Sequence, residues 1–115
     1  MIYEMNLSNK YFKLLKEEKK EIEIRLNDEK RKDLKVGDKI IFIEENQRIE
    51  KLETAVIRLE YFRTFKELID KYTVKEIASD SITKEELLED LYKFYPKGKE
   101  RKYGVVAIKL KKEKC

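Results

Sequence analysis

Charged and apolar residues alternate along residues 19–26 of the chain. The apolar positions are Ile22, Ile24 and Leu26, and the charged positions are Glu21, Glu23 and Arg25. A period of two is typical of a strand with one buried face, so we expect the isoleucines to point into a core. The charged face has two interpretations. It is either a solvated surface with an ion pair, or a site that offers both signs of charge to a ligand.

Four further stretches, at residues 2–5, 40–43, 52–62 and 103–110, have the pattern of strands. The run Ile40–Ile43 is apolar throughout, which predicts a strand covered on both faces. Alternation in 52–62 predicts a long strand in which Ala55, Ile57, Leu59 and Tyr61 share one face. Thr54, Arg58 and Glu60 share the other face. One barrel core is therefore expected to hold residues from several strands, namely Ile22, Ile24, Ile41, Ile57, Val106 and Ile108.

Helical spacing appears in residues 9–18, 65–72 and 84–95. Thr64 and Thr83 each precede a glutamate by three residues, which predicts a capping box at two of these helices. The predicted inward side chains are Tyr11, Leu14 and Leu15, then Phe65, Leu68, Ile69 and Tyr72, then Leu87, Leu88, Leu91, Phe94 and Tyr95. One helical turn is expected within 74–78, and 97–102 is a basic segment. Gly37 predicts a turn and Gly104 a close backbone approach.

The order of these elements predicts an α+β fold, a small β-barrel of about five to six strands with helices packed around it. Residues 1–115 are expected to form a single domain, because the length suits one core. Hydrophobic residues make up 41% of the chain and charged residues 45%, which still permits a packed core. No apolar run approaches the roughly 20 residues of a membrane helix, so we expect no membrane partner.

The chain contains no histidine and a single cysteine, Cys115. The lack of histidine excludes Ser-His and Cys-His nucleophilic pairs and most transition-metal sites, so we expect no metal and no cofactor. A lone cysteine cannot form an internal disulfide, which fits a reducing compartment and predicts a cytoplasmic protein.

Charge is unevenly distributed along the chain. Residues 44–90 carry a net charge of −5, from 13 Asp/Glu and 8 Lys/Arg, and residues 97–115 carry +6, from 8 Lys/Arg and 2 Asp/Glu. A basic end beside an acidic middle is consistent with an edge that faces phosphate. A surface rich in Lys and Glu, of the kind found in thermophiles, is the alternative interpretation.

Three blocks of the sequence resemble the ASCH family, a branch of the PUA-like superfold. The spacing Lys20-x-x-Glu23-x-Arg25 is similar to the family motif G-x-K-x-x-E-x-R. The run 26–31, the turn 35–38 and the closing stretch 101–108 also look like short archaeal and bacterial members. The chain departs from the motif at its glycine position, where it has Glu18. Either the loop before the strand is altered there, or its turn needs no positive φ.

The resemblance implies an ASCH/PUA-like domain that binds RNA or a nucleotide in a cleft between the barrel and the helices. It implies that Lys20, Glu23 and Arg25 line this cleft. Arg25 would bind a phosphate or a base edge, Glu23 would accept from a base amine, and Lys20 would contact phosphate. The complete set of candidate ligand-binding residues is Lys20, Glu23, Arg25, Asn27, Arg31 and Tyr103. Tyr61, Phe62 and Tyr103 are possible stacking partners or core residues.

Two other functions remain open at this point. One bacterial branch of the family hydrolyses the acetyl amide of N4-acetylcytidine, but it has a threonine at the position of Glu23. If this chain were such an amidohydrolase, Lys20 and Glu23 would be its catalytic residues, with Lys20 at a lowered pKa. Alternatively, the acidic helices within residues 64–95 would make the chain a protein-interaction module.

Overall fold

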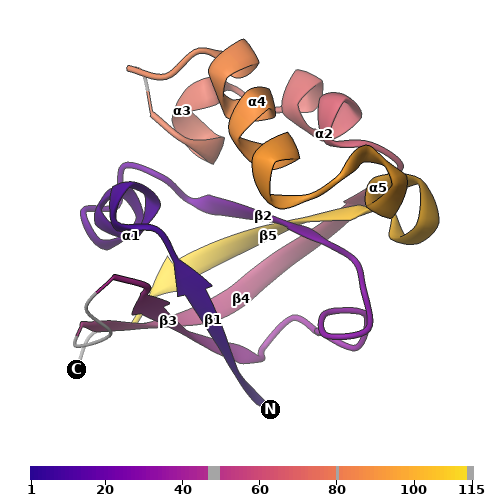
Figure 1. Cartoon of the computed structure of the whole chain (residues 1–115). Helices are drawn as coiled ribbons and strands as arrows, with labels where there is room; N and C mark the ends of the chain where they lie inside the picture. The colour runs from indigo at the N-terminus through magenta and orange to yellow at the C-terminus, as the bar shows by residue number, and fades with distance from the viewer. Residues whose placement is uncertain (47–49, 80, 114–115) are drawn as a thin grey trace.

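The computed structural model describes residues 1–46, 50–79 and 81–113, so Cys115 lies outside the described residues. Along the chain, β1 and α1 are followed by three consecutive strands, then by four consecutive helices, and last by β5 (Figure 1). The strands are β1 (Ile2–Leu7), β2 (Ile22–Leu26), β3 (Lys39–Glu44), β4 (Lys51–Phe62) and β5 (Val105–Lys112). The helices are α1 (Asn9–Lys16), α2 (Phe65–Lys71), α3 (Val74–Ile77), α4 (Lys84–Phe94) and α5 (Lys97–Tyr103). Helix α5 was not predicted, because the basic segment that forms it has no apolar stripe of helical spacing.

The strands form one sheet in the order β1-β3-β4-β5-β2. β1 pairs with β3 in parallel, and the other neighbours pair antiparallel. The sheet curls into a half-barrel, with β1 and β2 at its two edges, and this confirms the predicted α+β fold with a small five-stranded barrel. Because β2 is an edge strand, its charged side chains face the opening toward β1. This opening is where the candidate site lies.

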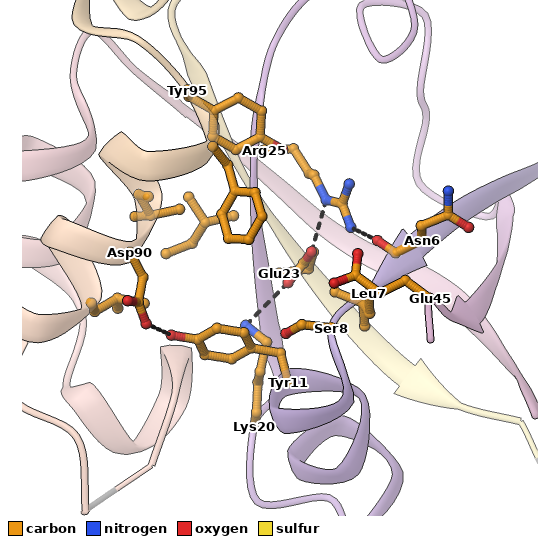
Figure 2. Close-up of a pocket in the computed structure, with 14 residues that line it drawn as sticks. Asn6, Leu7, Ser8, Tyr11, Lys20, Glu23, Arg25, Glu45, Asp90 and Tyr95 are labelled. Carbon is orange, nitrogen blue, oxygen red and sulfur yellow. Dashed lines mark hydrogen bonds and ion pairs between the residues drawn. The ribbon is translucent and has the colours of Figure 1, made fainter. Parts of the chain in front are cut away.

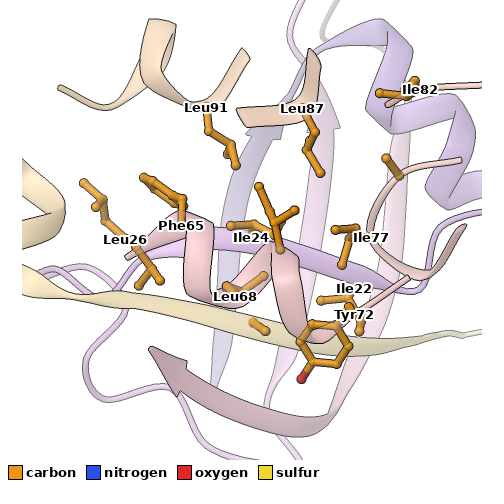
Figure 3. Close-up of a cluster of buried hydrophobic side chains, with 14 residues drawn as sticks. Ile22, Ile24, Leu26, Phe65, Leu68, Tyr72, Ile77, Ile82, Leu87 and Leu91 are labelled. Atoms are coloured by element: carbon orange, nitrogen blue, oxygen red, sulfur yellow. The ribbon is translucent and has the colours of Figure 1, made fainter. Parts of the chain in front are cut away.

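Buried side chains form two clusters, one on each face of the sheet. Successive residues of a strand point to opposite faces, and β5 contributes to both clusters in this way. Val105 and Ala107 join β2 beneath α2, α3 and α4 (Figure 3). Val106, Ile108 and Leu110 join α1, β1, β3 and β4 inside the half-barrel. Helix α1 closes the inner cluster with Phe12 and Leu15.

The prediction of a single barrel core was wrong for four of its six residues. Ile22 and Ile24 are buried, but they belong to the outer cluster under the helices. Ile41 is only partly buried, and the side chain of Ile57 is 45% exposed.

A bulge in β4 explains the exposure of Ile57. Val56 pairs with Leu110 and Arg58 with Lys109, so Ile57 is an extra residue without a partner on β5. Leu52, Thr54 and Val56 are buried before the bulge, and Leu59 packs on the inner cluster after it. Alternation therefore changes phase at Ile57, and one period of two could not describe the whole strand. Tyr61, for which a core position was one of two alternatives, is 54% exposed.

The predicted capping boxes are present only in part. The Thr64 and Thr83 side chains accept hydrogen bonds from the backbone amides of Glu67 and Glu86. Among the described residues, a complete capping box occurs only at α3, between Thr73 and Glu76, where none was predicted. The expected turn within 74–78 is helix α3. Phe94 was expected to face inward, but it is 62% exposed at the end of α4, whereas Tyr95 just after it is partly buried. Within the described residues, we found no helix that is long and apolar enough to span a membrane.

Candidate functional site

The charged face of β2 is buried. Lys20, Glu23 and Arg25 are only 3%, 6% and 8% exposed, although Glu21 at the start of the same face is exposed. The interpretation of this face as a solvated surface is therefore wrong for Glu23 and Arg25. Burying three charged groups is costly unless each is paired, so their contacts determine what the site can do.

Glu23 is the centre of this charged group. Its Oε2 accepts from Arg25 Nε at 2.7 Å, and its Oε1 lies 3.3 Å from Lys20 Nζ (Figure 2). Arg25 Nη2 also donates to the carbonyl oxygen of Asn6 at 2.7 Å. Asn6 belongs to β1, so the arginine links the two edge strands of the half-barrel. We call Lys20, Glu23 and Arg25 the charged triad.

Lys20 is held by three acceptors. Besides Glu23, its ammonium group donates to the carbonyl oxygen of Ile77 at 2.8 Å and to that of Ile22. An ammonium group has three protons, so these contacts match its full donor capacity. Lys20 thereby ties β2 to α3, the short helix that ends at Ile77.

The pKa values of the triad reflect burial and mutual attraction. Burial lowers the pKa of Lys20 below its usual value, and the attraction of Glu23 offsets this only in part. Burial alone would raise the pKa of Glu23, but Arg25 and Lys20 together outweigh it and hold that pKa below 4.5. Burial would lower the pKa of Arg25, whereas Glu23 and Tyr95 raise it above its usual value. Glu23 and Arg25 are therefore charged at neutral pH.

A cavity of about 230 Å³ opens onto the triad. Besides the triad, its walls come from the end of β1, from α1 and from α4, as Figure 2 shows. The other lining residues are Asn6, Leu7, Ser8, Tyr11, Ile24, Glu45, Leu87, Asp90, Leu91, Phe94 and Tyr95. The cavity therefore lies between the half-barrel and the helices, where the ASCH resemblance predicted a cleft.

A hydrogen bond between α1 and α4 builds the wall opposite Arg25. Tyr11 donates to Asp90 Oδ2 at 2.9 Å, and the Lys20 ammonium group lies 5.7 Å from the centre of the Tyr11 ring. Burial and this hydrogen bond raise the pKa of Tyr11, so its hydroxyl stays protonated at neutral pH. The ring of Tyr11 thus joins the charged triad to the aromatic and apolar side chains of the wall.

The turn before β2 sets the position of Lys20. The amides of Lys19 and Lys20 both donate to the carbonyl oxygen of Leu14, and Glu18 has a φ of 60°. That left-handed conformation favours glycine, which is the residue of the family motif at this position. The turn therefore keeps the positive φ, and Glu18 adopts it despite its side chain.

The remaining predicted binding residues lie outside this cavity. Asn27 and Arg31 are in the turn after β2, where the Asn27 amide donates to the carbonyl oxygen of Gly104 and Arg31 pairs with Asp28. Asn27 Oδ1 and Arg31 Nε are buried without a hydrogen-bond partner among the described residues. Tyr103 lies at the end of α5, in a separate groove.

Several cavity residues were not found by sequence reasoning. Tyr11, Asp90, Glu45 and Phe94 come from segments that meet only through tertiary structure, and Tyr11 and Asp90 are 79 residues apart. Tyr11 and Phe94 had been assigned to helix stripes, because aromatic residues at helical spacing are usually core. The sequence offered one indication that a residue of this stripe could line a cavity. Phe94 lies three residues after Leu91, at the edge of the apolar stripe, where a side chain can leave the core.

The charges around the cavity limit what it can bind. The carboxylates of Glu23, Glu45 and Asp90 against the cations of Lys20 and Arg25 leave a net formal charge of −1. Across the described residues, no group of three His, Cys, Asp or Glu side chains is arranged to hold a metal ion. A neutral, polar molecule with both hydrogen-bond donors and acceptors suits these walls better than a free phosphate.

Comparisons with known proteins agree with the fold. The model of the ASCH domain family matches residues 5–114. The crystal structure of hypothetical protein PH0355 is 37% identical, with a TM-score of 0.86, over 98% of this chain and 100% of that one. The solution structure of protein PF0455 from Pyrococcus furiosus is 34% identical, with a TM-score of 0.78, over 100% of both chains. No curated protein matches the sequence. The family match spans nearly all of the sequence, and the chain therefore belongs to the ASCH domain family.

Proposed function

We propose that this protein binds RNA, and that the cavity above the charged triad accepts one nucleobase or nucleoside of the strand. The observation that carries the proposal is a buried donor and acceptor pair, Arg25 and Glu23, at the floor of a cavity with aromatic walls. The membership in a family related to PUA domains supports RNA as the ligand class.

The floor of the cavity suits the edge of a base. A carboxylate can accept about four hydrogen bonds, and Glu23 uses two of these positions for Lys20 and Arg25. Glu23 can therefore accept a further bond from a base amine or imino group, and the neighbouring guanidinium group offers a donor direction. A volume of about 230 Å³ lies below the roughly 300–1,000 Å³ of drug-sized pockets, as expected for a single base or nucleoside.

The walls suit the face of a base. Tyr11, Phe94 and Tyr95 line the cavity, and Phe94 is 62% exposed even though it is fully apolar. Exposed apolar rings beside a polar floor are the usual platform for bases of single-stranded RNA, and each stacked base contributes roughly 1–3 kcal/mol. Phe94 at the mouth of the cavity is therefore the predicted stacking residue.

Binding fits the geometry better than the amidohydrolase alternative does. A catalytic Lys20 would have to lose a proton in order to attack or to accept one. Burial does lower the pKa of Lys20, as such a role requires, but its ammonium group already has an acceptor for each of its three protons. Lys20 therefore uses its contacts to support Glu23 and the packing of α3.

The test is a binding isotherm with a fluorescent single-stranded RNA of mixed sequence. Phe94→Ala should weaken binding about 5- to 150-fold, which corresponds to the loss of one stacked base. Tyr61→Ala is the matched control, because Tyr61 is a similarly exposed aromatic residue outside the cavity. Equal affinities for the wild type and Phe94→Ala would contradict the proposal. Arg25→Ala is less suitable, since Arg25 also links β1 to β2.

A further inference from the structure

A second hollow of about 540 Å³ lies at the end of the sheet, between α5 and the last residues of β4. Its lining includes four cations, Arg63, Lys97, Arg101 and Lys102, and one carboxylate, Glu100, for a net formal charge of +3. We call this hollow the basic groove. Its charge is opposite in sign to the net −1 of the cavity above the triad.

Helix α5 turns its carboxylate inward and its cations outward. Glu100 is 7% exposed, and its oxygens accept from the Phe65 amide at 2.9 Å and from the Tyr92 hydroxyl at 2.7 Å. Glu100 is thus occupied as a cap for α2, and it does not neutralise the surface. The outward side chains of α5 are all cations apart from Gly98 and Tyr103.

The four cations of α5 share one surface and have no carboxylate partner. Some surface lysines elsewhere pair with acids, as Lys66 does with Asp70 at 3.0 Å. Within the described part of the chain, no carboxylate oxygen lies within 4.0 Å of a side-chain nitrogen of Lys97, Lys99, Arg101 or Lys102. Lys97 and Arg101 are also four residues apart in a helix, where like charges repel. A bound anion would relieve that repulsion.

A short stretch of chain connects the walls of the cavity and of the basic groove. Tyr95 lines the cavity and Lys97 lines the groove, and two residues of chain span at most about 7 Å. Tyr103 helps to hold the basic surface in place, because the ammonium groups of Lys99 and Lys102 lie 5.8 Å and 5.1 Å from the centre of its ring. One strand could therefore insert a base into the cavity and lay its backbone along the groove.

We infer that the basic groove binds the phosphate backbone of the same single-stranded RNA whose base enters the cavity. This inference rests on the proposed function and divides the work between two surfaces. The cavity recognises a base and the groove neutralises phosphates. The affinity for an RNA oligonucleotide therefore falls as salt rises, because the cations of α5 contact its phosphates. The affinity for a nucleoside, which has no phosphate, is independent of salt.

The test compares two double variants of equal charge by RNA isotherms over a range of salt concentrations. Lys97→Gln with Arg101→Gln should reduce the slope of log affinity against log salt by about 1.4, or about 0.7 for each lost phosphate contact. Lys13→Gln with Lys75→Gln removes two exposed cations outside the groove and should leave the slope near that of the wild type. Circular dichroism checks that both variants remain folded.

A slope that changes equally in both variants, or in neither, would overturn the inference. Binding of the wild type to phosphatidylserine vesicles through Lys97 and Arg101, without binding to RNA, would also overturn it in favour of a membrane surface. The proposed function has a separate readout, because it depends on Phe94. If Phe94→Ala loses RNA affinity but the salt slope of the α5 variant is unchanged, only the role of the groove is rejected. If the slope changes but Phe94→Ala keeps its affinity, only the role of the cavity is rejected.

Discussion

Glu23 is the residue on which the buried charges depend. It balances two cations that are both less than 9% exposed, so removing its charge leaves Lys20 and Arg25 without compensation. We predict that Glu23→Gln lowers the free energy of unfolding by about 3–5 kcal/mol. Urea denaturation at pH 7 measures this change. Glu53→Gln, an exposed control of the same chemistry, should change it by no more than about 0.5 kcal/mol.

A comparison of the wild type with Glu23→Gln at different pH values tests the lowered pKa of Glu23. Because this pKa is lowered in the folded state, the unfolded chain binds more protons near pH 4. The stabilisation by Glu23 is therefore complete above the ordinary value of 4.5 and is lost as the pH falls through the folded pKa. The stability of the wild type should fall toward that of Glu23→Gln in acid. A constant difference between them from pH 7 to pH 2 would contradict this assignment.

Glu18 shows how a departure from the family motif can be tested. A left-handed φ costs a residue with a side chain about 1–2 kcal/mol, and glycine avoids that cost but loses more entropy on folding. We predict that Glu18→Gly raises the free energy of unfolding by about 0.5–1 kcal/mol. Glu17→Gly, at a φ of −84°, should lower it by a similar amount. Equal effects of the two substitutions in urea denaturation would show that the backbone of Glu18 is not strained.

The junction between α5 and β5 depends on the backbone of Gly104. This glycine has φ 73° and ψ −178°, a conformation almost confined to glycine, and a Cβ there would lie 3.2 Å from the carbonyl oxygen of Phe62. We predict that Gly104→Ala lowers the free energy of unfolding by about 1–3 kcal/mol. Thermal and urea unfolding both report this change.

Gly98 is the matched control for Gly104. It lies within α5, and a Cβ at this position would meet no atom within 4 Å. Gly98→Ala should therefore raise the free energy of unfolding by about 0.5–1 kcal/mol, through helix propensity and a less flexible unfolded chain. If both alanine variants were destabilised to the same extent, the special role of Gly104 in separating α5 from β5 would be wrong.

Periodicity predicted elements well wherever one pattern held along a whole segment. The strand around Ile24 and the helix opened by Thr83 are both present, because one face of each is continuously apolar. The inner face of β4 was not predictable, since the bulge at Ile57 reverses the alternation and leaves no mark in the composition. Helix α5 was not predicted because it has no apolar stripe. Its buried side is formed by the carboxylate of Glu100.

The candidate site was only partly predictable from sequence. The ASCH resemblance grouped Lys20, Glu23 and Arg25, and the structure brings these three together. Tyr103 was grouped with them but lies in the basic groove. The aromatic wall could not be predicted, because it requires contact between α1 and α4, which are distant in sequence. Local patterns indicate where strands and helices lie, whereas the cavity depends on how the helices pack across the half-barrel.

The molecule as a whole separates two kinds of surface. The opening between β1 and β2 is closed by the charged triad and lies beneath a cavity whose lining is slightly acidic. The groove on α5 is strongly basic. This division explains how one small fold could combine base recognition with phosphate binding. The basic end of the sequence supplies most of the cations of this groove, and a phosphate-facing edge there stays a prediction.

The most direct test of the central claim is an NMR titration of the ¹⁵N-labelled protein with nucleosides that carry no phosphate. Cytidine, adenosine, guanosine and uridine are added separately, and amide shifts are followed around the cavity and in α5. We predict that at least one nucleoside shifts the amides of Ser8, Tyr11 and Asp90, that α5 is little affected, and that Phe94→Ala weakens the response. If no nucleoside shifts the cavity amides up to its solubility limit, or if the shifts occur only in α5, the cavity is not a base-binding site.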